Sequence, residues 1–257
     1  MSETTGGEIE KCIHQIWLGK NAPPTEWMDT VTEFAKKYGY EYKLWTEKNV
    51  DSLDWDSIPG LRREYGKFRT EMAGRADIIR LLALYKFGGI YIDADSVIMK
   101  PLKFSKFLEK NKAAVFFGWE TISKADSKKL GDFGPEIRGT KRLVANGLIG
   151  AKAGHAFIEK LLNGIVSNAE REAEGHAWKR VGPLYVSRVY FTSKDSFPDV
   201  HIYPMKYFYP MHWRGIQDPK LHEKVKIPAE SMLFQYGYST NSFHDYFNDR
   251  RRTRRKR

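Results

Sequence analysis

Apolar residues along the chain recur with two periods. Short apolar runs typical of buried strands lie at 12–18, 41–45, 90–93, 113–117 and 147–151, and longer amphipathic stretches typical of helices lie at 25–38, 66–87 and 155–168. In the second stretch, Ile78, Leu81, Leu82 and Tyr85 form an i, i+3, i+4, i+7 stripe that ends at Gly88-Gly89. This alternation predicts an α/β fold with a mostly parallel central sheet.

The chain shows no internal repeat and no linker-like stretch, so we expect one domain over residues 1–249. The charged, glycine-containing segment 123–142 is expected to be a long loop, a type of segment that often has a function. After Pro198 the sequence becomes aromatic and turn-rich, and its pattern assigns no element. Residues 250–257 form a basic tail that we expect to be disordered.

The charge of the chain is concentrated in that tail. The formal net charge is +11, but seven positive charges lie in residues 250–257, and the rest of the chain has 36 basic residues against 32 acidic ones. A near-neutral body argues against a fold built to bind nucleic acid. The single cysteine, Cys12, excludes a disulfide within the chain.

No stretch of 18 apolar residues is present, and the polar residues 1–11 lack the features of a signal peptide. We therefore expect no transmembrane segment and, by default, a cytoplasmic location.

Two aspartates follow the strand predicted at 90–93. Asp93 and Asp95 are separated by one residue, so in extended backbone they point to the same face. Adjacent carboxylates suit Mg²⁺ or Mn²⁺, and a cation held by so few protein ligands usually takes its others from phosphates. The pattern favours a nucleotide-handling enzyme, because ligands bind at the carboxyl ends of strands in such sheets. The alternative is a pair of solvated aspartates in a turn.

Three further side chains are candidates for the same site. Asp77 and Arg80 share one side of the predicted helix and interrupt an apolar segment. They form either a local ion pair or a pair aimed into the cleft, where Arg80 binds an anion or a sugar hydroxyl. Trp17 ends the first strand and is either a core residue or a stacking surface for a nucleobase.

Several segments resemble the glycosyltransferases with a DXD sugar-binding region, the family 32 group, with yeast initiating α-1,6-mannosyltransferase and α-1,4-galactosyltransferase relatives and, more distantly, the clostridial glucosylating toxins. The segments that carry the resemblance are 13–19 and 74–95, with weaker blocks at 146–151, 154–155, 182–183 and 209–210. The resemblance implies a Rossmann-like GT-A fold, a nucleotide-sugar donor, Mn²⁺ or Mg²⁺ as cofactor, and transfer with retention at the anomeric carbon.

The resemblance also implies a role for each matching residue. Asp77, Arg80 and Asp93 are expected to be catalytic, with Asp95 binding the metal directly and Asp93 through water. Residues expected to contact the donor are Trp17, Leu18, Asp77, Arg80, Tyr91, Asp93, Ala94 and Asn146. The C-terminal segment departs from the family pattern, so the remaining metal ligand is expected among Gln235, Asn241 and Ser242.

We therefore expect a metal-dependent retaining hexosyltransferase, with UDP-glucose or UDP-galactose favoured over GDP-mannose as donor and a glycan or protein as acceptor. Two alternatives stay open. Paired carboxylates also suit a metal-dependent nuclease or phosphohydrolase. The second alternative is a binding module, in which residues 250–257 contact nucleic acid or an anionic membrane surface.

Overall fold

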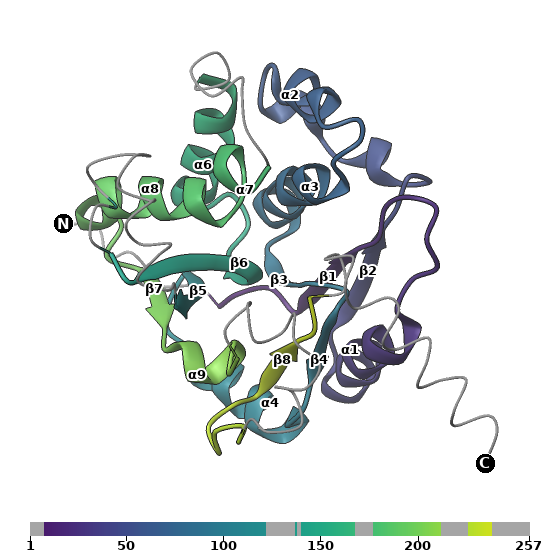
Figure 1. The fold of residues 1–257 in the computed structure, drawn as a ribbon, viewed down its shortest axis with the longest axis vertical. Helices are drawn as coiled ribbons and strands as arrows, with labels where there is room; N and C mark the ends of the chain where they lie inside the picture. The colour runs from purple at the N-terminus through teal and green to yellow at the C-terminus, as the bar shows by residue number, and fades with distance from the viewer. Residues whose placement is uncertain (1–7, 122–136, 138–139, 168–176, 212–225, 238–257) are drawn as a thin grey trace.

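The computed structural model describes residues 8–121, 137, 140–167, 177–211 and 226–237. A six-stranded sheet in the order β2-β1-β3-β6-β5-β7 forms its middle layer (Figure 1). The strands are β1 (Cys12–Ile16), β2 (Glu41–Trp45), β3 (Gly89–Ile92), β5 (Val115–Thr121), β6 (Arg142–Ala151) and β7 (Val200–Tyr203). β2, β1 and β3 run parallel, as do β5 and β7, and β6 is antiparallel to both of its neighbours. The predicted α/β fold with a mostly parallel sheet is confirmed.

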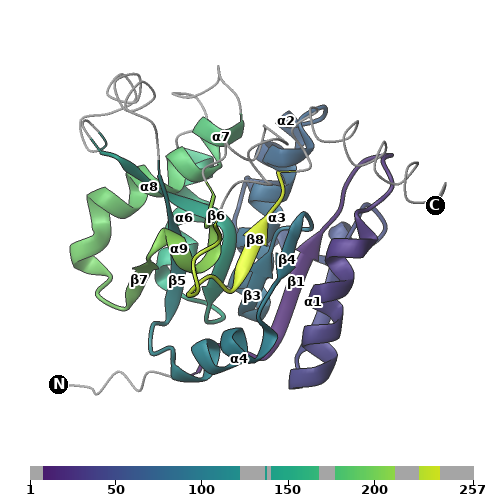
Figure 2. The same ribbon diagram turned by 60° about the horizontal axis from the view of Figure 1, so that its bottom comes forward.

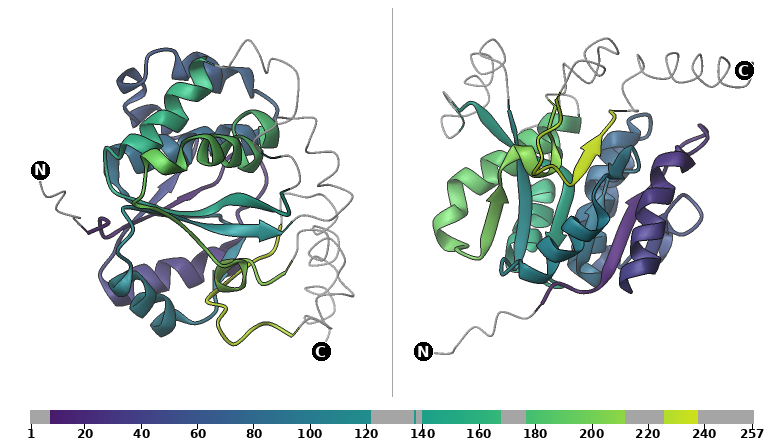
Figure 3. Two further views of the ribbon diagram at one scale, coloured as in Figure 1. Left: turned by 90° about the vertical axis from the view of Figure 1, so that its left-hand side faces the viewer. Right: turned by 90° about the horizontal axis from the view of Figure 1, so that it is seen from below.

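Helices cover both faces of this sheet (Figures 1 and 3). One face carries α2 (Leu61–Lys67), α3 (Met72–Phe87), α6 (Ala156–Ser167), α7 (Ala177–Arg180) and α8 (Pro183–Ser193). The other carries α1 (Thr25–Tyr38), α4 (Pro101–Lys110), α9 (Met205–Phe208) and a ribbon of two antiparallel strands, β4 (Ser96–Ile98) and β8 (Leu233–Gln235). Short 3₁₀ turns occupy Val50–Ser52, Trp55–Ser57 and Lys194–Ser196.

Each face has its own hydrophobic core. Ile78 and Leu82 of α3 pack with Phe157 and Leu161 of α6 in one core, and Phe34 of α1 belongs to the other. α3 is buried on nearly all sides, and its charged residues Asp77 and Arg80 lie within the protein. Burying an unpaired charge is costly, which predicts that these residues have partners.

Several element boundaries differ from the prediction. The helix predicted at 66–87 is two helices, because the chain turns after Lys67 to bury Phe68, whose N–H donates to Tyr65 O. β6 begins at Arg142, before the predicted 147, and β5 reaches Thr121, beyond the predicted 117. Pairing of β5 with β6 over this longer span explains both extensions.

Other elements gave no clear signal in the sequence. Pro101 begins α4, since proline is tolerated in the first helical turn. The region after Pro198 supplies β7, α9 and β8. Most of segment 123–142 and the tail 250–257 lie outside the described residues.

Gly88-Gly89 ends α3 as predicted. Gly89 has φ +97°, and a Cβ there would lie 2.3 Å from Cys12 O, so β3 can approach β1 this closely only with glycine. Figure 2 shows β1, β3 and β5 ending on the same side of the molecule. Across the described ranges, no helix combines the length and the apolar character needed to cross a membrane.

Candidate active site

The Asp93-Ala94-Asp95 turn lies where β3 ends and the chain enters β4. It is held by two main-chain hydrogen bonds, from Asp93 N–H to Gly147 O (2.8 Å) and from Ser96 N–H to Asp93 O (3.0 Å). β3 lies between β1 and β6, so the turn is at the middle of the carboxyl edge of the sheet. This is the edge at which α/β sheets bind ligands.

Arg80 is the centre of a buried polar cluster beside this turn. Its guanidinium lies 3.0 Å from Asp77 Oδ1 and 3.2 Å from Asp93 Oδ1, and it donates to Asn146 O at 2.5 Å. Asn146 in turn donates from its side-chain amide to Asp77 Oδ1 at 2.8 Å. The structure therefore brings together four of the predicted site residues, from α3, the turn after β3, and β6.

The charges in this cluster depend on one another. Burial raises the pKa of Asp77 to about 6, with Arg80 opposing this and Asp93 adding to it. Burial alone would lower the pKa of Arg80, but the surrounding Tyr91, Asp93 and Asp77 raise it. Arg80 is therefore a fixed cation between two carboxylates. It reduces their repulsion and fixes their positions.

Two tyrosines complete the support of this cluster. Tyr91 donates its hydroxyl to Asp93 Oδ1 at 2.6 Å, and its ring lies 4.4 Å from the Arg80 guanidinium carbon. Because Tyr91 is 1% exposed, its side chain positions Asp93 and Arg80. Tyr209 accepts a hydrogen bond from Leu148 N–H (2.7 Å) in β6, which holds the strand next to the turn. The sequence indicated Tyr209 only as part of a weak block.

Gln235 reaches the same turn from β8. Its amide nitrogen donates to Asp93 Oδ2 at 2.6 Å and lies 3.4 Å from Asp95 Oδ1. Gly147 makes this approach sterically feasible, since a Cβ there would lie 2.5 Å from Asp93 Oδ2. Of the three residues predicted to complete a metal site, Gln235 is thus placed beside both aspartates. The other two, Asn241 and Ser242, lie outside the described residues.

These side chains suit a divalent cation only in part. Two carboxylates and an amide oxygen are the hard ligands that Mg²⁺ and Mn²⁺ prefer. Within the described ranges, no group of three or more His, Cys, Asp or Glu residues is arranged to hold a metal. The donor set fits a cation that takes most of its ligands from water and from a bound phosphate.

The other predicted donor contacts lie at the same edge of the sheet. Trp17 follows β1, is half-buried, and donates its indole N–H to Asn21 O at 2.8 Å. Leu18 and Ala94 are buried. Gln15, which the sequence did not single out, donates to Asp93 O at 3.3 Å and so links β1 to the turn.

Comparison with known proteins agrees with the resemblance. Residues 24–114 match the model described as glycosyltransferase sugar-binding region containing DXD motif. Inositol phosphoceramide mannosyltransferase 3 of Schizosaccharomyces pombe is 24% identical over 244 residues, which cover 92% of this chain and 56% of that protein. Inositol phosphoceramide mannosyltransferase 2 of the same organism is 33% identical over 88 residues, 34% of this chain and 25% of that protein. The chain spans about half the length of the first of these relatives.

The fold is shared with a solved structure. Mouse xyloside xylosyltransferase 1, in its apo form, superposes with a TM-score of 0.50 at 11% identity and covers 90% of this chain and 99% of that one. The predicted GT-A fold is thereby confirmed, and the matching segment contains Asp77, Arg80 and the Asp93-Ala94-Asp95 turn. Residues 24–114 of the chain are therefore similar to the glycosyltransferase sugar-binding region containing the DXD motif, and the chain as a whole is similar to an inositol phosphoceramide mannosyltransferase.

Proposed function

We propose that this protein transfers a hexosyl group from a nucleotide sugar to an acceptor hydroxyl, with Mn²⁺ or Mg²⁺ as cofactor and with retention at the anomeric carbon. The observation that carries the proposal is the cluster of Asp77, Arg80, Asp93 and Asn146 beside Asp95, at the carboxyl edge of the sheet. The family resemblance supports retention.

Asp77 and Arg80 are proposed to hold the donor sugar. Arg80 and Asn146 both contact Oδ1 of Asp77, and within the described part of the chain no hydrogen bond to Oδ2 is found. Oδ2 is thus oriented by its partners and able to accept a bond from a sugar hydroxyl. A charge-assisted hydrogen bond of this kind is stronger than a neutral one.

Asp95 and Gln235 are proposed to hold the cation. When bound, the cation stabilises the negative charge that develops on the departing diphosphate. Asp95 offers a carboxylate, and rotation of the Gln235 amide by half a turn would present its oxygen where its nitrogen now lies beside Asp93 and Asp95. Asp93 is kept in place by Tyr91 and Arg80, so it can serve ribose, sugar and metal-bound water without moving.

The relatives guide the choice of substrates. The sequence alone favoured UDP-glucose or UDP-galactose, but the names of the S. pombe relatives favour mannose, so we propose GDP-mannose as the first donor to test. The same names favour an inositol phosphoceramide acceptor, in place of the glycan or protein expected from the sequence.

The proposal is tested by incubating the purified protein with Mn²⁺ and GDP-mannose, UDP-glucose or UDP-galactose, with and without acceptor. Free nucleoside diphosphate and transferred sugar are measured, and the anomeric configuration of the product is read by NMR. We expect turnover of one donor, highest for GDP-mannose, and loss of at least about 100-fold in Asp95→Asn.

Asp54→Asn is the matched control, because Asp54 forms an exposed ion pair with Lys86 and is not one of the site residues. Its activity should equal that of the wild type. Equal activity of Asp95→Asn and Asp54→Asn, or cleavage of nucleic acid without turnover of any nucleotide sugar, would refute the proposal.

A further inference from the structure

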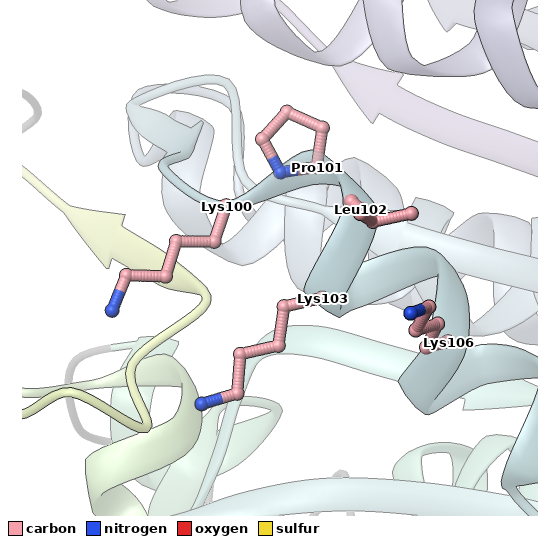
Figure 4. Close-up of a pocket in the computed structure, with 5 residues that line it drawn as sticks. All are labelled: Lys100, Pro101, Leu102, Lys103 and Lys106. Atoms are coloured by element: carbon pink, nitrogen blue, oxygen red, sulfur yellow. The ribbon is translucent and has the colours of Figure 1, made fainter.

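A second region of the molecule combines clustered positive charge with an exposed apolar side chain. It lies where α4 begins, in an open hollow lined by Lys100, Pro101, Leu102, Lys103 and Lys106, which we call the α4 surface (Figure 4). Leu102 is 60% exposed, the highest value among the large hydrophobic residues that the structure describes. Neither the family match nor the candidate site gives this surface a role.

The lysines of the α4 surface are close together in spite of their like charges. Lys100 and Lys103 point toward the segment that precedes β8 (Figure 4), and their ammonium groups donate to the same oxygen, Ala229 O, at 2.6 and 3.0 Å. Two ammonium groups on one neutral oxygen repel each other, so an anion between or above them would be favoured.

Nearby carboxylates offset this charge only in part, since Glu230 attracts Lys103 but is hydrogen-bonded to another lysine. Glu230 is paired with Lys206 at 2.6 Å, and Glu109 accepts a hydrogen bond from Ser105 at 2.8 Å. In the described part of the chain, no carboxylate lies within ion-pair distance of Lys100, Lys103 or Lys106. The α4 surface is therefore a locally unbalanced cationic patch.

An exposed leucine on the same helical turn as several lysines is the pattern of a surface that lies on an anionic bilayer. The ammonium groups gain from the negative surface potential, and the apolar side chain enters the boundary between headgroups and acyl chains. Soluble anions would use the lysines but would leave Leu102 in water. Charge complementarity and the exposed leucine together favour a bilayer.

We propose that the α4 surface docks the protein on membranes that contain anionic phospholipids. Docking does not require the proposed donor or acceptor, and it concerns the end of the β4–β8 ribbon opposite to Asp95 and Gln235. Each lysine near such a surface contributes to the free energy of membrane binding, and its loss should weaken that binding about fivefold.

The experiment measures sedimentation of the full chain with vesicles of neutral phosphatidylcholine, with and without 30% phosphatidylserine. The test variant is Lys103→Ala/Lys106→Ala, which keeps the Lys100 bond to Ala229. The control is Lys36→Ala/Lys37→Ala, which removes two exposed lysines from the last turn of α1 and changes the net charge equally. Both variants keep residues 250–257, so any contribution of that tail is the same.

We expect wild type and control to bind the anionic vesicles about 25-fold more tightly than the test variant, and Leu102→Ser to bind several-fold more weakly than wild type. Thermal unfolding and turnover of a soluble donor should be equal in all four proteins. Equal losses in the test and control variants would overturn the proposal, as would full binding by Leu102→Ser. A failed donor assay with intact vesicle binding would count against the enzymatic proposal alone.

Discussion

The two ends of the β4–β8 ribbon have opposite charges in opposite surroundings. At one end Asp95 is buried, and Gln235 contacts it and Asp93. At the other end, beyond the bond from Met99 N–H to Met232 O, the half-buried Lys100 and the exposed Lys103 both donate to Ala229 O. The same two short strands thus connect a buried anionic site to an exposed cationic surface.

The difference between the two ends lies in how each charge is accommodated. Buried ions lose hydration and are tolerated only with partners, so Asp77, Arg80 and Asp93 are held by one another and by hydrogen bonds. Exposed lysines keep most of their hydration, so they need no such network. Substitutions at the buried end should therefore change stability and chemistry together, whereas substitutions at the exposed end should change only association.

Removal of Arg80 should have the largest effect. Arg80→Ala leaves Asp77 and Asp93 buried without their cation, and we expect the free energy of unfolding to fall by about 3–5 kcal/mol. Arg62→Ala is the control, since Arg62 pairs with Asp51 on the surface and should contribute less than about 1 kcal/mol. Urea denaturation measures both, and similar losses would show that burial does not distinguish the ion pairs of Arg80 from the exposed ion pair of Arg62.

The pH dependence of stability should depend on Asp77. Its pKa is raised to about 6 by burial, above its ordinary value of 3.8, so the native state binds this proton more tightly than the unfolded chain. Protonated Asp77 therefore stabilises the native state fully below about pH 4. This stabilisation, about 3 kcal/mol of the free energy of unfolding, is lost as the pH rises through 6. Asp77→Asn keeps an acceptor for Asn146 but does not titrate. Its free energy of unfolding relative to wild type should therefore rise by about 3 kcal/mol between pH 4 and 7.

This gain is read as the difference between two denaturation series in metal-free buffer. His14 produces the opposite slope, because burial lowers its pKa to about 4, but it is present in both proteins and cancels. Parallel curves for wild type and Asp77→Asn would contradict the assignment of a raised pKa to Asp77.

Gln235→Glu should convert a bridging donor into a third carboxylate. Repulsion from Asp93 and Asp95 is expected to lower the free energy of unfolding by about 1–3 kcal/mol at neutral pH without metal. Mn²⁺ should then raise the unfolding temperature of the variant more than that of the wild type. Gln235→Leu serves as the control, and an equal response to Mn²⁺ in the two variants would argue against Gln235 facing the cation.

The smallest effect is expected at the exposed end. Lys103→Ala removes one of two hydrogen bonds to Ala229 O and should change the free energy of unfolding by no more than about 0.5 kcal/mol. Thermal and urea unfolding of the metal-free protein provide the measurement. If Lys103→Ala lowered the free energy of unfolding as much as Arg80→Ala does, the buried and exposed ends of the ribbon would not differ in their contribution to stability.

Local sequence patterns predicted much of this fold. The apolar runs and the Gly88-Gly89 terminator located β1, β2, β3 and the end of α3, because these features depend on neighbouring residues. β8 is only three residues long and is fixed by pairing with β4, distant in sequence, so no local signal could identify it. The break between α2 and α3 depends on burial of Phe68, so the local sequence pattern did not predict it either.

The candidate site was predicted in the same uneven way. Asp77, Arg80, Asp93 and Asp95 were candidates because charged residues interrupt apolar segments and the family resemblance covers them. Gln15 and Tyr209 act through hydrogen bonds to Asp93 O and Leu148 N–H, which only the folded chain brings about. Gln235 was one of three alternatives, and its position beside both aspartates distinguishes it.

Calorimetric titration of GDP-mannose tests the central claim most directly. Wild type and Asp95→Asn are each titrated with and without Mn²⁺. If Asp95 holds a cation that bridges to the diphosphate, Mn²⁺ will tighten binding to the wild type by at least tenfold and will leave binding to Asp95→Asn unchanged. An equal gain from Mn²⁺ in the two proteins would contradict this assignment of the site.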